Sequence, residues 1–386
     1  MMSKSAKLRR DRAAILEKER MLDPVGTAKE KQRKKKQTRL VTLAALVAIV
    51  LMIATAYNII RIMGKNHLMN SVVNAAPAIE KVVPVEETTE EEKVVWQDDW
   101  IKHNGKVYDY NEDIITFLVM GIDKSGDVKE VKEGTNGGQA DAEFLLVLDP
   151  HKKSICVIGI NRNTMADVDI YDNTGAYVDT VKAQIAVQHG FGNGVEESCE
   201  YQVKAVRKLL YDLPIHGYAA INMSAVPTIN DLVGGVDLTA IEDMRKVDYR
   251  LREGENIHLN GELAYLYVRW RDYYQFGSAD KRLERQKQYL KAFIQKAKSE
   301  GKKNIGIVSD IYKAVSDEMT TNITMDESLY LAPEVVDYSF SENNFRMIQG
   351  ETVMGDKFEE FYPDEQALYE MILDVFYEEV DINGKK

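Results

Sequence analysis

The sequence predicts a three-layer α/β domain that is preceded by a single membrane-spanning helix. Two observations carry this prediction: an uncharged apolar run near the N-terminus, and apolar strand-like runs further on that alternate with helical segments. The composition, with 45% hydrophobic and 29% charged residues, is that of a folded protein. The length of 386 residues fits two to three average domains or one large α/β domain.

The apolar run extends from Leu40 to Ile60 and contains 21 residues without a charge. A helix of this length spans about 31 Å, which matches the hydrocarbon core of a bilayer. The alternatives are a buried core helix and a signal peptide, but a signal peptide would lie closer to the N-terminus and end in small residues. We therefore expect a single transmembrane helix over residues 40–63.

The charges on either side of this helix predict its orientation. Residues 1–40 carry 14 Lys and Arg but only 5 Asp and Glu, whereas the whole chain has a net charge of −12. By the positive-inside rule, residues 1–39 are expected to be a basic cytoplasmic tail, and everything after the helix lies outside the cell membrane. An acidic body is not the profile of a nucleic-acid-binding protein, so no nucleic-acid partner is expected.

The part after the helix divides into a stalk and a domain. Residues 64–105 are expected to be an acidic stalk and linker, because they lack periodicity and contain the run Glu86–Glu92. The extracellular domain is then expected over 106–386. Its apolar runs predict strands at Ile115–Met120, Glu143–Asp149, Ser154–Ile160 and Tyr218–Asn222, and its helical segments are Cys199–Tyr211 and Val226–Leu232. Cys156 and Cys199 could form a disulfide or remain apart, and the sequence leaves both open.

An arginine-rich segment around residue 270 is the most suggestive of chemistry. Strand periodicity would place Arg269 and Arg271 on one face of a strand, as a double fork suited to bidentate binding of phosphate oxygens. In the helix predicted to follow, Arg282 and Gln286 are four residues apart and would share a face. The alternative is that these arginines are surface charges paired with carboxylates.

Two aspartates lie at the ends of predicted strands. Asp123 follows one apolar strand and Asp141 precedes the next, so both can reach the same edge of the sheet, where α/β proteins bind ligands. The alternative is that each is a helix cap or a turn residue. The sequence contains no His/Cys cluster at zinc spacing, no P-loop and no GxSxG elbow.

Six motifs occur in one order along residues 112–380. They are FLVMGID, QAD at Gln139–Asp141, INRNTM at Ile160–Met165, LVGGVDL at Leu232–Leu238, LNGELAYLYVRWR at Leu259–Arg271 and RLERQ at Arg282–Gln286. In these motifs the sequence resembles the LytR-CpsA-Psr (LCP) family of cell-wall glycopolymer transferases of Gram-positive bacteria. The resemblance implies an α/β/α sandwich with a mixed central sheet, in which an apolar groove holds a polyprenyl lipid and its mouth holds the pyrophosphate.

The resemblance also implies roles for individual residues. Asp123 and Asp141 match two carboxylates associated with Mg²⁺ (or Mn²⁺). The arginines that bind the pyrophosphate are matched by Arg162, Arg269, Arg271 and Arg282, with Gln286 and Lys182 as further polar positions. The implied catalytic residues are Asp123, Asp141, Arg162, Arg269 and Arg271. The implied activity transfers a phosphorylated glycopolymer from a polyprenyl-pyrophosphate carrier in the membrane to a sugar hydroxyl of peptidoglycan.

The chain departs from the family pattern at three positions. Gln139 stands where many relatives have Arg, Asn163 where they have Asp, and Ala279 where an acidic residue is common. Two alternatives to the transferase therefore remain: a pyrophosphate hydrolase that uses the same site, and a non-catalytic protein that binds polyprenyl phosphate or the cell wall.

Overall fold

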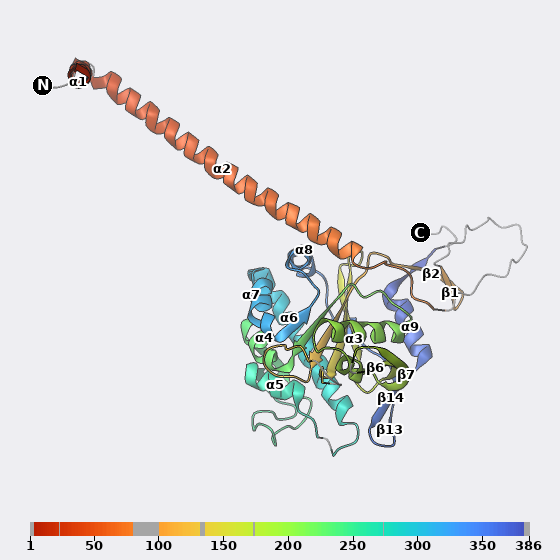
Figure 1. Cartoon of the computed structure of the whole chain (residues 1–386). Helices are drawn as coiled ribbons and strands as arrows, with labels where there is room; N and C mark the ends of the chain where they lie inside the picture. Colours follow the sequence, from red (N-terminus) through yellow and green to blue (C-terminus); the bar gives the residue numbers. More distant parts are fainter. Residues whose placement is uncertain are drawn as a thin grey trace, which may run out of the picture. The chain divides into compact units, whose positions relative to one another are not determined.

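The computed structural model of the protein describes residues 4–22, 24–79, 100–131, 136–172, 174–272 and 274–381 (Figure 1). The chain forms two compact units, Met1–Arg61 and Ile62–Lys386. The first unit consists of helix α1 (Lys4–Leu22) and most of helix α2 (Pro24–Asn70). The acidic run Glu86–Glu92 of the predicted stalk lies outside the described residues.

Helix α2 contains the predicted membrane span. Among the residues that the structure describes, it is the one helix long and apolar enough to cross a membrane, and none of its most apolar part is buried in the protein. This exposure excludes the alternative of a core helix. The helix extends beyond the predicted 40–63 on both sides, because the flanking segments are rich in good helix formers such as Lys, Gln and Met.

The second unit is built on a mixed sheet of six strands in the described part of the chain. Their order is β11 (Met319–Thr321), β8 (Gly217–Asn222), β3 (Ile115–Ile122), β4 (Ala140–Asp149), β5 (Ser154–Ile160) and β12 (Phe345–Met347). β8 runs parallel to β3 and β12 runs parallel to β5, whereas the other pairs are antiparallel. The four predicted strands are confirmed as β3, β4, β5 and β8, with ends that agree to within three residues.

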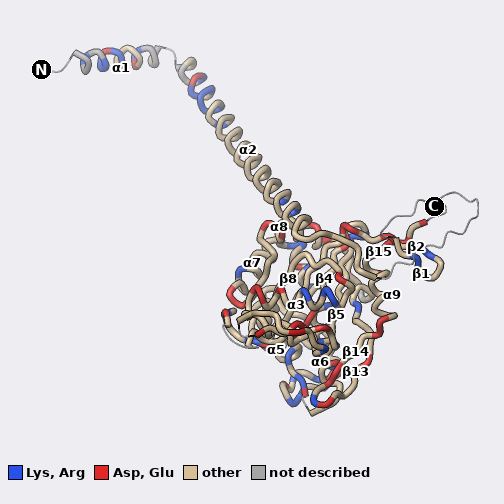
Figure 2. The backbone as a smooth tube through the Cα atoms, turned by 45° about the vertical axis from the view of Figure 1, so that its right-hand side comes forward, with Lys and Arg blue, Asp and Glu red and all other residues tan. Residues whose placement is uncertain are grey.

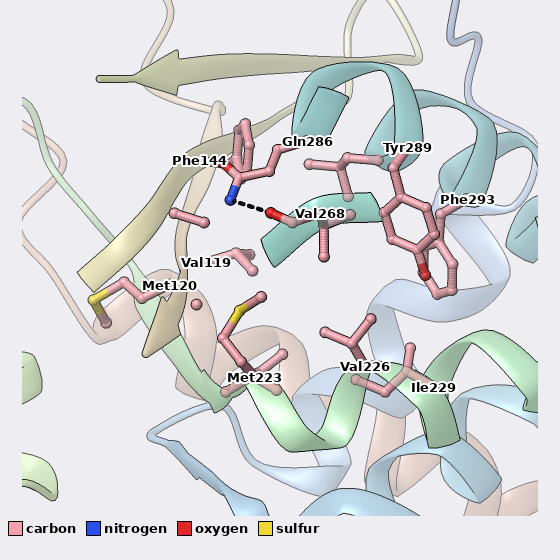
Figure 3. A pocket seen from close by; sticks show the side chains of 14 residues that line it. Val119, Met120, Phe144, Met223, Val226, Ile229, Val268, Gln286, Tyr289 and Phe293 are labelled. Carbon is pink, nitrogen blue, oxygen red and sulfur yellow. Dashed lines mark hydrogen bonds between the residues drawn. The ribbon is translucent and has the colours of Figure 1, made fainter. Parts of the chain in front are cut away.

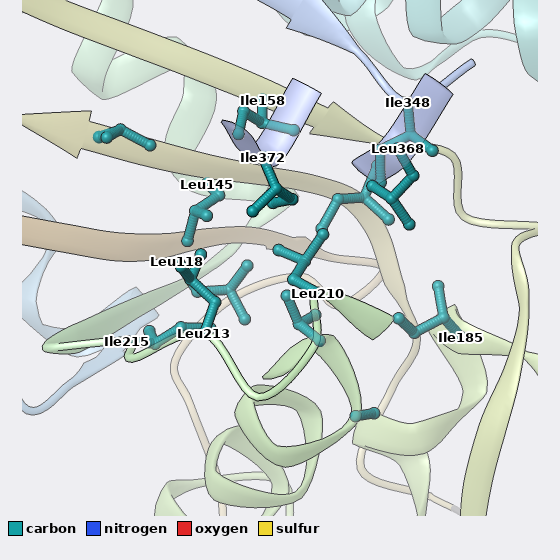
Figure 4. Close-up of a cluster of buried hydrophobic side chains, with 14 of the residues drawn as sticks. Leu118, Leu145, Ile158, Ile185, Leu210, Leu213, Ile215, Ile348, Leu368 and Ile372 are labelled. Atoms are coloured by element: carbon teal, nitrogen blue, oxygen red, sulfur yellow. The ribbon is translucent and has the colours of Figure 1, made fainter. Parts of the chain in front are cut away.

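Helices cover both faces of this sheet, as predicted. Helices α3 (Glu196–Leu209) and α9 (Glu365–Phe376) pack on the face that carries Leu118, Leu145 and Ile158 (Figure 4). Helices α6 (Ser278–Lys303) and α8 (Met325–Val335) pack on the opposite face, where the neighbouring side chains Phe117, Phe144 and Val157 point. Both faces of the strands are buried, which explains why these strands are continuous apolar runs.

Smaller elements complete the second unit. The remaining α-helices are α4 (Val226–Leu232), α5 (Gly261–Arg269) and α7 (Ile307–Val315). The smaller sheets are formed by β1 (Ile101–His103), β2 (Lys106–Tyr110) and β15 (Tyr377–Val380), by β6 (Met165–Tyr171) and β7 (Tyr177–Gln184), by β9 (Val236–Thr239) and β10 (Asn256–Leu259), and by β13 (Gly350–Met354) and β14 (Glu359–Pro363). Helix α4 has the predicted bounds, and helix α3 covers most of the predicted Cys199–Tyr211.

Both ends of the predicted stalk belong to the folded unit. Leu68, near the end of α2, is fully buried, and so is Ile101 in β1. A Cβ atom on Gly64 would lie 2.2 Å from the carbonyl oxygen of Asp326, so α2 packs directly on the start of α8. The folded unit therefore begins well before residue 106, because apolar residues of the supposed stalk pack into its core.

The strand predicted around Arg269 and Arg271 is wrong, because this segment is helix α5. The side chain of Asn260 caps the helix by accepting a hydrogen bond from the backbone N–H of Leu263 at 3.1 Å. Apolar side chains recur at three- and four-residue spacing and face the core, and this helical period prevails over the alternation in YLYVRWR. Arg269 ends the helix and Arg271 lies beyond it, so the two do not share a strand face.

Candidate functional site

Charged side chains gather at one edge of the central sheet, where β3 and β5 end and β4 begins. Asp141, at the start of β4, is held between two arginines. Its Oδ1 lies 3.0 Å from Nε of Arg162, which follows β5, and its Oδ2 accepts a hydrogen bond from Nη1 of Arg282 at 2.9 Å. Arg282 comes from the first turns of α6, so this cluster joins the sheet to the helix layer.

Gln139 connects the second aspartate to the same cluster. Its backbone N–H donates to Oδ1 of Asp123 at 2.7 Å, and the backbone N–H of Asp123 donates to its carbonyl oxygen at 3.1 Å. The side-chain oxygen of Gln139 accepts a hydrogen bond from Arg162. Where many relatives have an arginine, Gln139 therefore supplies a hydrogen-bond acceptor that orients Arg162.

The other two departures are accommodated nearby. Asn161 donates from Nδ2 to Oδ1 of Asp280 at 2.7 Å, so Asp280 supplies a carboxylate next to the buried Ala279. Asn163 is turned toward β7, where its Oδ1 accepts a hydrogen bond from Gln184 at 3.1 Å. Arg162 is consequently oriented by Asp141 and Gln139 and not by residue 163.

The electrostatics of Arg162 favour a bound anion. Burial is the main cause that lowers its pKa, and the positive charges of Arg282 and Arg271 act in the same direction, whereas Asp141 opposes them. Arg162 and Arg282 contact the same carboxylate, that of Asp141, and the charge of Arg271 also acts on Arg162. Guanidinium groups gathered in this way are suited to bidentate binding of phosphate oxygens.

An apolar cavity of about 190 Å³ is lined by residues of the sheet, α4 and α6 (Figure 3), among them Ala142, which follows Asp141. Gln286, one turn after Arg282, lies at one end of the cavity, which extends along α6 to Phe293. Met223 and Val226 line the side opposite α6. A Cβ atom on Gly121 would lie 3.2 Å from both Ala142 Cβ and Met223 Sδ, so glycine leaves the cavity room at its sheet side.

Two of the predicted site residues make their contacts elsewhere. Arg269 is exposed, and its guanidinium lies 5.3 Å from the ring centre of Tyr265. Lys182, on β7, pairs with Asp167 at 2.9 Å and lines a different cavity. The structure thus brings Asp123, Asp141, Arg162, Arg271, Arg282 and Gln286 together, but not Arg269 or Lys182.

Glu143 is a residue of this region that the sequence analysis missed. It follows Asp141 by two residues in β4, is fully buried, and accepts a hydrogen bond from Nε2 of Gln202 at 2.9 Å. Burial raises the pKa of its carboxyl group to about 8, so it is mostly protonated at neutral pH. The signal in the sequence was a single acidic residue at the head of the apolar run EFLLVLD.

Arg285 is a second residue that was missed. Its side chain is 1% exposed, its Nε donates to the carbonyl oxygen of Tyr267 at 2.9 Å, and it also binds the carbonyl oxygen of Trp270 and the carboxylate of Glu242. Arg285 therefore satisfies backbone carbonyls at the C-terminal end of α5, immediately before Arg271. Within RLERQ, Arg282 therefore binds Asp141 in the charged cluster, whereas Arg285 positions the segment that carries Arg271.

The carboxylates of Asp123 and Asp141 are of the kind that a divalent cation shared with a phosphate ligand would need. In the described parts of the chain, no group of three or more His, Cys, Asp or Glu side chains could hold a metal. Asp123 and Asp141 supply carboxylate oxygens from neighbouring strands, and Mg²⁺ is commonly bound by one or two carboxylates together with phosphate oxygens and water. Because both oxygens of Asp141 already contact arginines, an ion bound there would have to replace one of these contacts.

The fold and the site together define an α/β/α domain with an arginine-rich cluster close to an apolar cavity. The profile of the LytR-CpsA-Psr family matches residues 73–373, and the chain belongs to this family. The resemblance seen in the sequence motifs is thereby confirmed.

Known relatives agree with this assignment. The polyisoprenyl-teichoic acid–peptidoglycan teichoic acid transferase TagU of Bacillus cereus (strain AH820) is 27% identical over 213 residues, which cover 55% of this chain and 62% of that protein. This chain therefore spans less than two thirds of the length of that relative. The crystal structure of B. subtilis TagV is similar with a TM-score of 0.52 and 25% identity, over 67% of this chain and 93% of that chain. A structure of TagT bound to LI-WTA has the same fold, with a TM-score of 0.51, 22% identity, and coverage of 68% and 89%.

Proposed function

We propose that the protein is a membrane-anchored phosphotransferase that moves a phosphorylated glycopolymer from a polyprenyl-pyrophosphate carrier to a sugar hydroxyl of peptidoglycan. The observation that carries this proposal is that Arg162 and Arg282 contact Asp141, whose neighbour Ala142 lines an apolar cavity. A lipid pyrophosphate has the same division into an apolar chain and a charged head. The name of the TagU relative, a polyisoprenyl-teichoic acid transferase, supports the same reaction.

The proposed donor fits each part of the site. Its polyprenyl chain would lie along α6 between Gln286 and Phe293, where burial of apolar surface contributes about 25 cal/mol per Å². Its pyrophosphate carries two negative charges and would bind Arg162 and Arg282, which are largely withdrawn from water. Guanidinium–phosphate bonds are stronger in such surroundings than on an open surface.

In the proposed reaction, the acceptor hydroxyl oxygen attacks the phosphorus that carries the polymer. The bond from this phosphorus to the bridging oxygen breaks, and the polyprenyl monophosphate leaves with that oxygen. Arg162, Arg271 and Arg282 stabilise the charge that develops on the leaving phosphate, and the exposed carboxylate of Asp123 is available to accept the hydroxyl proton. Mg²⁺ bound by Asp123 and Asp141 would neutralise further phosphate charge.

The proposed topology places the site on the wall side of the membrane of a Gram-positive cell. Lys and Arg are concentrated in α1 and the first turns of α2 (Figure 2), so the positive-inside rule holds the N-terminus in the cytoplasm. The domain would then lie outside, next to the membrane in which the donor is dissolved. External protease should therefore remove the domain from intact protoplasts and leave the basic tail protected.

The full chain in lipid nanodiscs provides the test. With a labelled polyprenyl-pyrophosphate-linked sugar phosphate, we expect transfer of the label to peptidoglycan fragments and release of polyprenyl monophosphate. Chelation of Mg²⁺ should stop the transfer, and Arg162→Ala should reduce it by about 100-fold or more. Equal release of the label with and without acceptor would identify a hydrolase, and binding of donor without turnover would identify a carrier-binding protein.

A further inference from the structure

A second cavity lies between the β6–β7 hairpin, the end of α3 and the segment that joins β14 to α9. Its volume is about 550 Å³, and its lining includes Tyr211, Tyr362, Lys182, Lys208 and Asp167. None of these residues belongs to the charged cluster around Asp141. We propose that this cavity, called here the acceptor cavity, binds the glycan strand of peptidoglycan that receives the polymer. This inference rests on the proposed transferase function.

Tyr211 is held in the acceptor cavity by an unusual backbone conformation. It follows the C-terminus of α3 with φ of +56°, and the N–H of the next residue, Asp212, donates to the carbonyl oxygen of Arg207 at 2.7 Å. This is a helix-ending turn in which glycine is the favoured residue, because a side chain is strained at positive φ. Asp212 also has a positive φ of +60°, so the turn itself sets this conformation. The ring of Tyr211 packs against the core, and its hydroxyl donates to the carbonyl oxygen of Glu365 at 3.4 Å, which fixes the ring in the cavity wall.

The chemistry of the lining suits a sugar better than a strongly charged ligand. The rings of Tyr211 and Tyr362 offer flat apolar surfaces on which the C–H face of a pyranose can pack. The charges of the lining balance, since Lys182 and Lys208 are matched by the carboxylates of Asp167 and Glu365, and Lys182 pairs with Asp167 at 2.9 Å. Paired charges provide both donors and acceptors for hydroxyl and acetamido groups, but no excess positive charge for a polyphosphate or a nucleic acid.

The acceptor cavity is adjacent to the proposed site of phosphate transfer. Met165 lines the cavity and follows Arg162 by three residues, which limits their Cα separation to about 10 Å. The boundary between the two is polar: Gln184 donates to Oδ1 of Asn163 at 3.1 Å and to the carbonyl oxygen of Glu359 at 2.7 Å. A glycan bound in the cavity can therefore direct a hydroxyl toward Arg162 without crossing an apolar barrier.

Titration calorimetry on the full chain in detergent micelles tests this proposal. The probe is a peptidoglycan tetrasaccharide of alternating N-acetylglucosamine and N-acetylmuramic acid. We expect the wild-type protein to bind it, and we expect Tyr211→Gly and Tyr362→Ala each to raise its Kd by about tenfold or more. Tyr249→Ala, which changes a tyrosine that is 71% exposed and lies outside the cavity, should leave the Kd unchanged. Affinity for the lipid-pyrophosphate donor should be the same in all four proteins.

The outcomes separate this proposal from the transferase function. Absence of tetrasaccharide binding to the wild type at millimolar concentration, or equal Kd values in the wild type and both cavity variants, would overturn the acceptor cavity. Failure of the wild type to bind the donor would instead refute the proposed function, and with it the acceptor role, whereas the Kd values would still show whether the cavity binds the glycan. If Tyr211→Gly does not fold, Tyr362→Ala decides the matter, because Tyr362 is 48% exposed and its loss leaves the core intact.

Discussion

Arg282 and Asp141 form an ion pair that joins α6 to β4, with Nη1 of the arginine 2.9 Å from Oδ2 of the aspartate. Only 5% of the Arg282 side chain and 20% of the Asp141 side chain are exposed, so the pair is largely withdrawn from water. The other oxygen of the same carboxylate contacts Arg162. Asp141 thus neutralises two of the arginines that the proposed pyrophosphate needs. A cation that binds Asp141 would release them, so cation and pyrophosphate should bind cooperatively.

The first prediction follows from this arrangement. Asp141→Asn should lower the free energy of unfolding by about 2 kcal/mol, because it leaves two largely buried arginines without their counter-charge. It should also abolish the rise in melting temperature that Mg²⁺ gives in the presence of lipid pyrophosphate. Thermal denaturation of the full chain measures both effects, with Asp127→Asn in the exposed loop after β3 as the control. A melting temperature and Mg²⁺ response like those of the control would make Asp141 an ordinary surface carboxylate.

The second prediction distinguishes Arg271 from Arg269. Arg271→Lys should reduce kcat/KM for transfer by about 10- to 100-fold, because lysine cannot reproduce bidentate contacts beside Arg162. Arg269→Lys should cost less than about threefold, since this arginine is exposed and lies over Tyr265. Both variants carry the same chemical change, Arg to Lys, so each serves as the control for the other. A larger loss in Arg269→Lys would show that Arg269 turns toward the substrate.

The sequence was sufficient for the features that depend on local pattern. β5 has the predicted bounds Ser154–Ile160, because a strand buried on both faces has to be a continuous apolar run. Asp123 and Asp141 lie at the same sheet edge, because an antiparallel neighbour begins where the first strand ends. The pairing of Arg282 with Asp141 could not be predicted from a local pattern, because it depends on where α6 crosses the sheet.

The wrong and incomplete predictions share a physical cause, which is that tertiary contacts are not visible in a local pattern. YLYVRWR alternates like a strand, but Leu263 and Tyr267 belong to a helical stripe that packs into a core with β9 and α6. Leu68 follows a membrane span and has little local reason to be buried, yet it packs against Ile115 at the start of β3. Lys182 matched a family position, but the β6–β7 hairpin places it opposite Asp167.

The third prediction concerns the dependence of stability on pH. Glu143 has a pKa of about 8 in the folded protein, against 4.5 for an unperturbed carboxyl. Below about pH 4.5 the carboxyl group of Glu143 is protonated in both the folded and the unfolded protein, so its contribution to the free energy of unfolding is fully present. Above this pH the unfolded protein releases the proton first. The contribution of Glu143 therefore falls by up to about 1.4 kcal/mol per pH unit until the pH reaches the folded pKa.

Glu143→Gln tests this dependence, because the amide keeps an acceptor for Gln202 and cannot ionise. Guanidinium denaturation at pH 5, 6, 7 and 8 should show the wild type losing stability relative to the variant at each step. His216, whose pKa burial lowers to about 4, changes both proteins equally and cancels in the difference. Parallel stability curves for the two proteins would mean that Glu143 is ionised in the fold.

The last prediction concerns the junction between the anchor helix and the folded unit. Leu68→Ala should lower the free energy of unfolding by about 2–4 kcal/mol, because Leu68 is fully buried among Ile115 and other core residues. Gly64→Val should undock the end of α2, since the Cβ position lies 2.2 Å from the carbonyl oxygen of Asp326. Hydrogen exchange of the full chain should then increase over residues 62–79 and the first turn of α8 in both variants. Val73→Ala, at a position that is 85% exposed, should leave exchange and stability unchanged. If Leu68→Ala and Gly64→Val behave like Val73→Ala, residues 62–70 are a free tether and the domain folds without them.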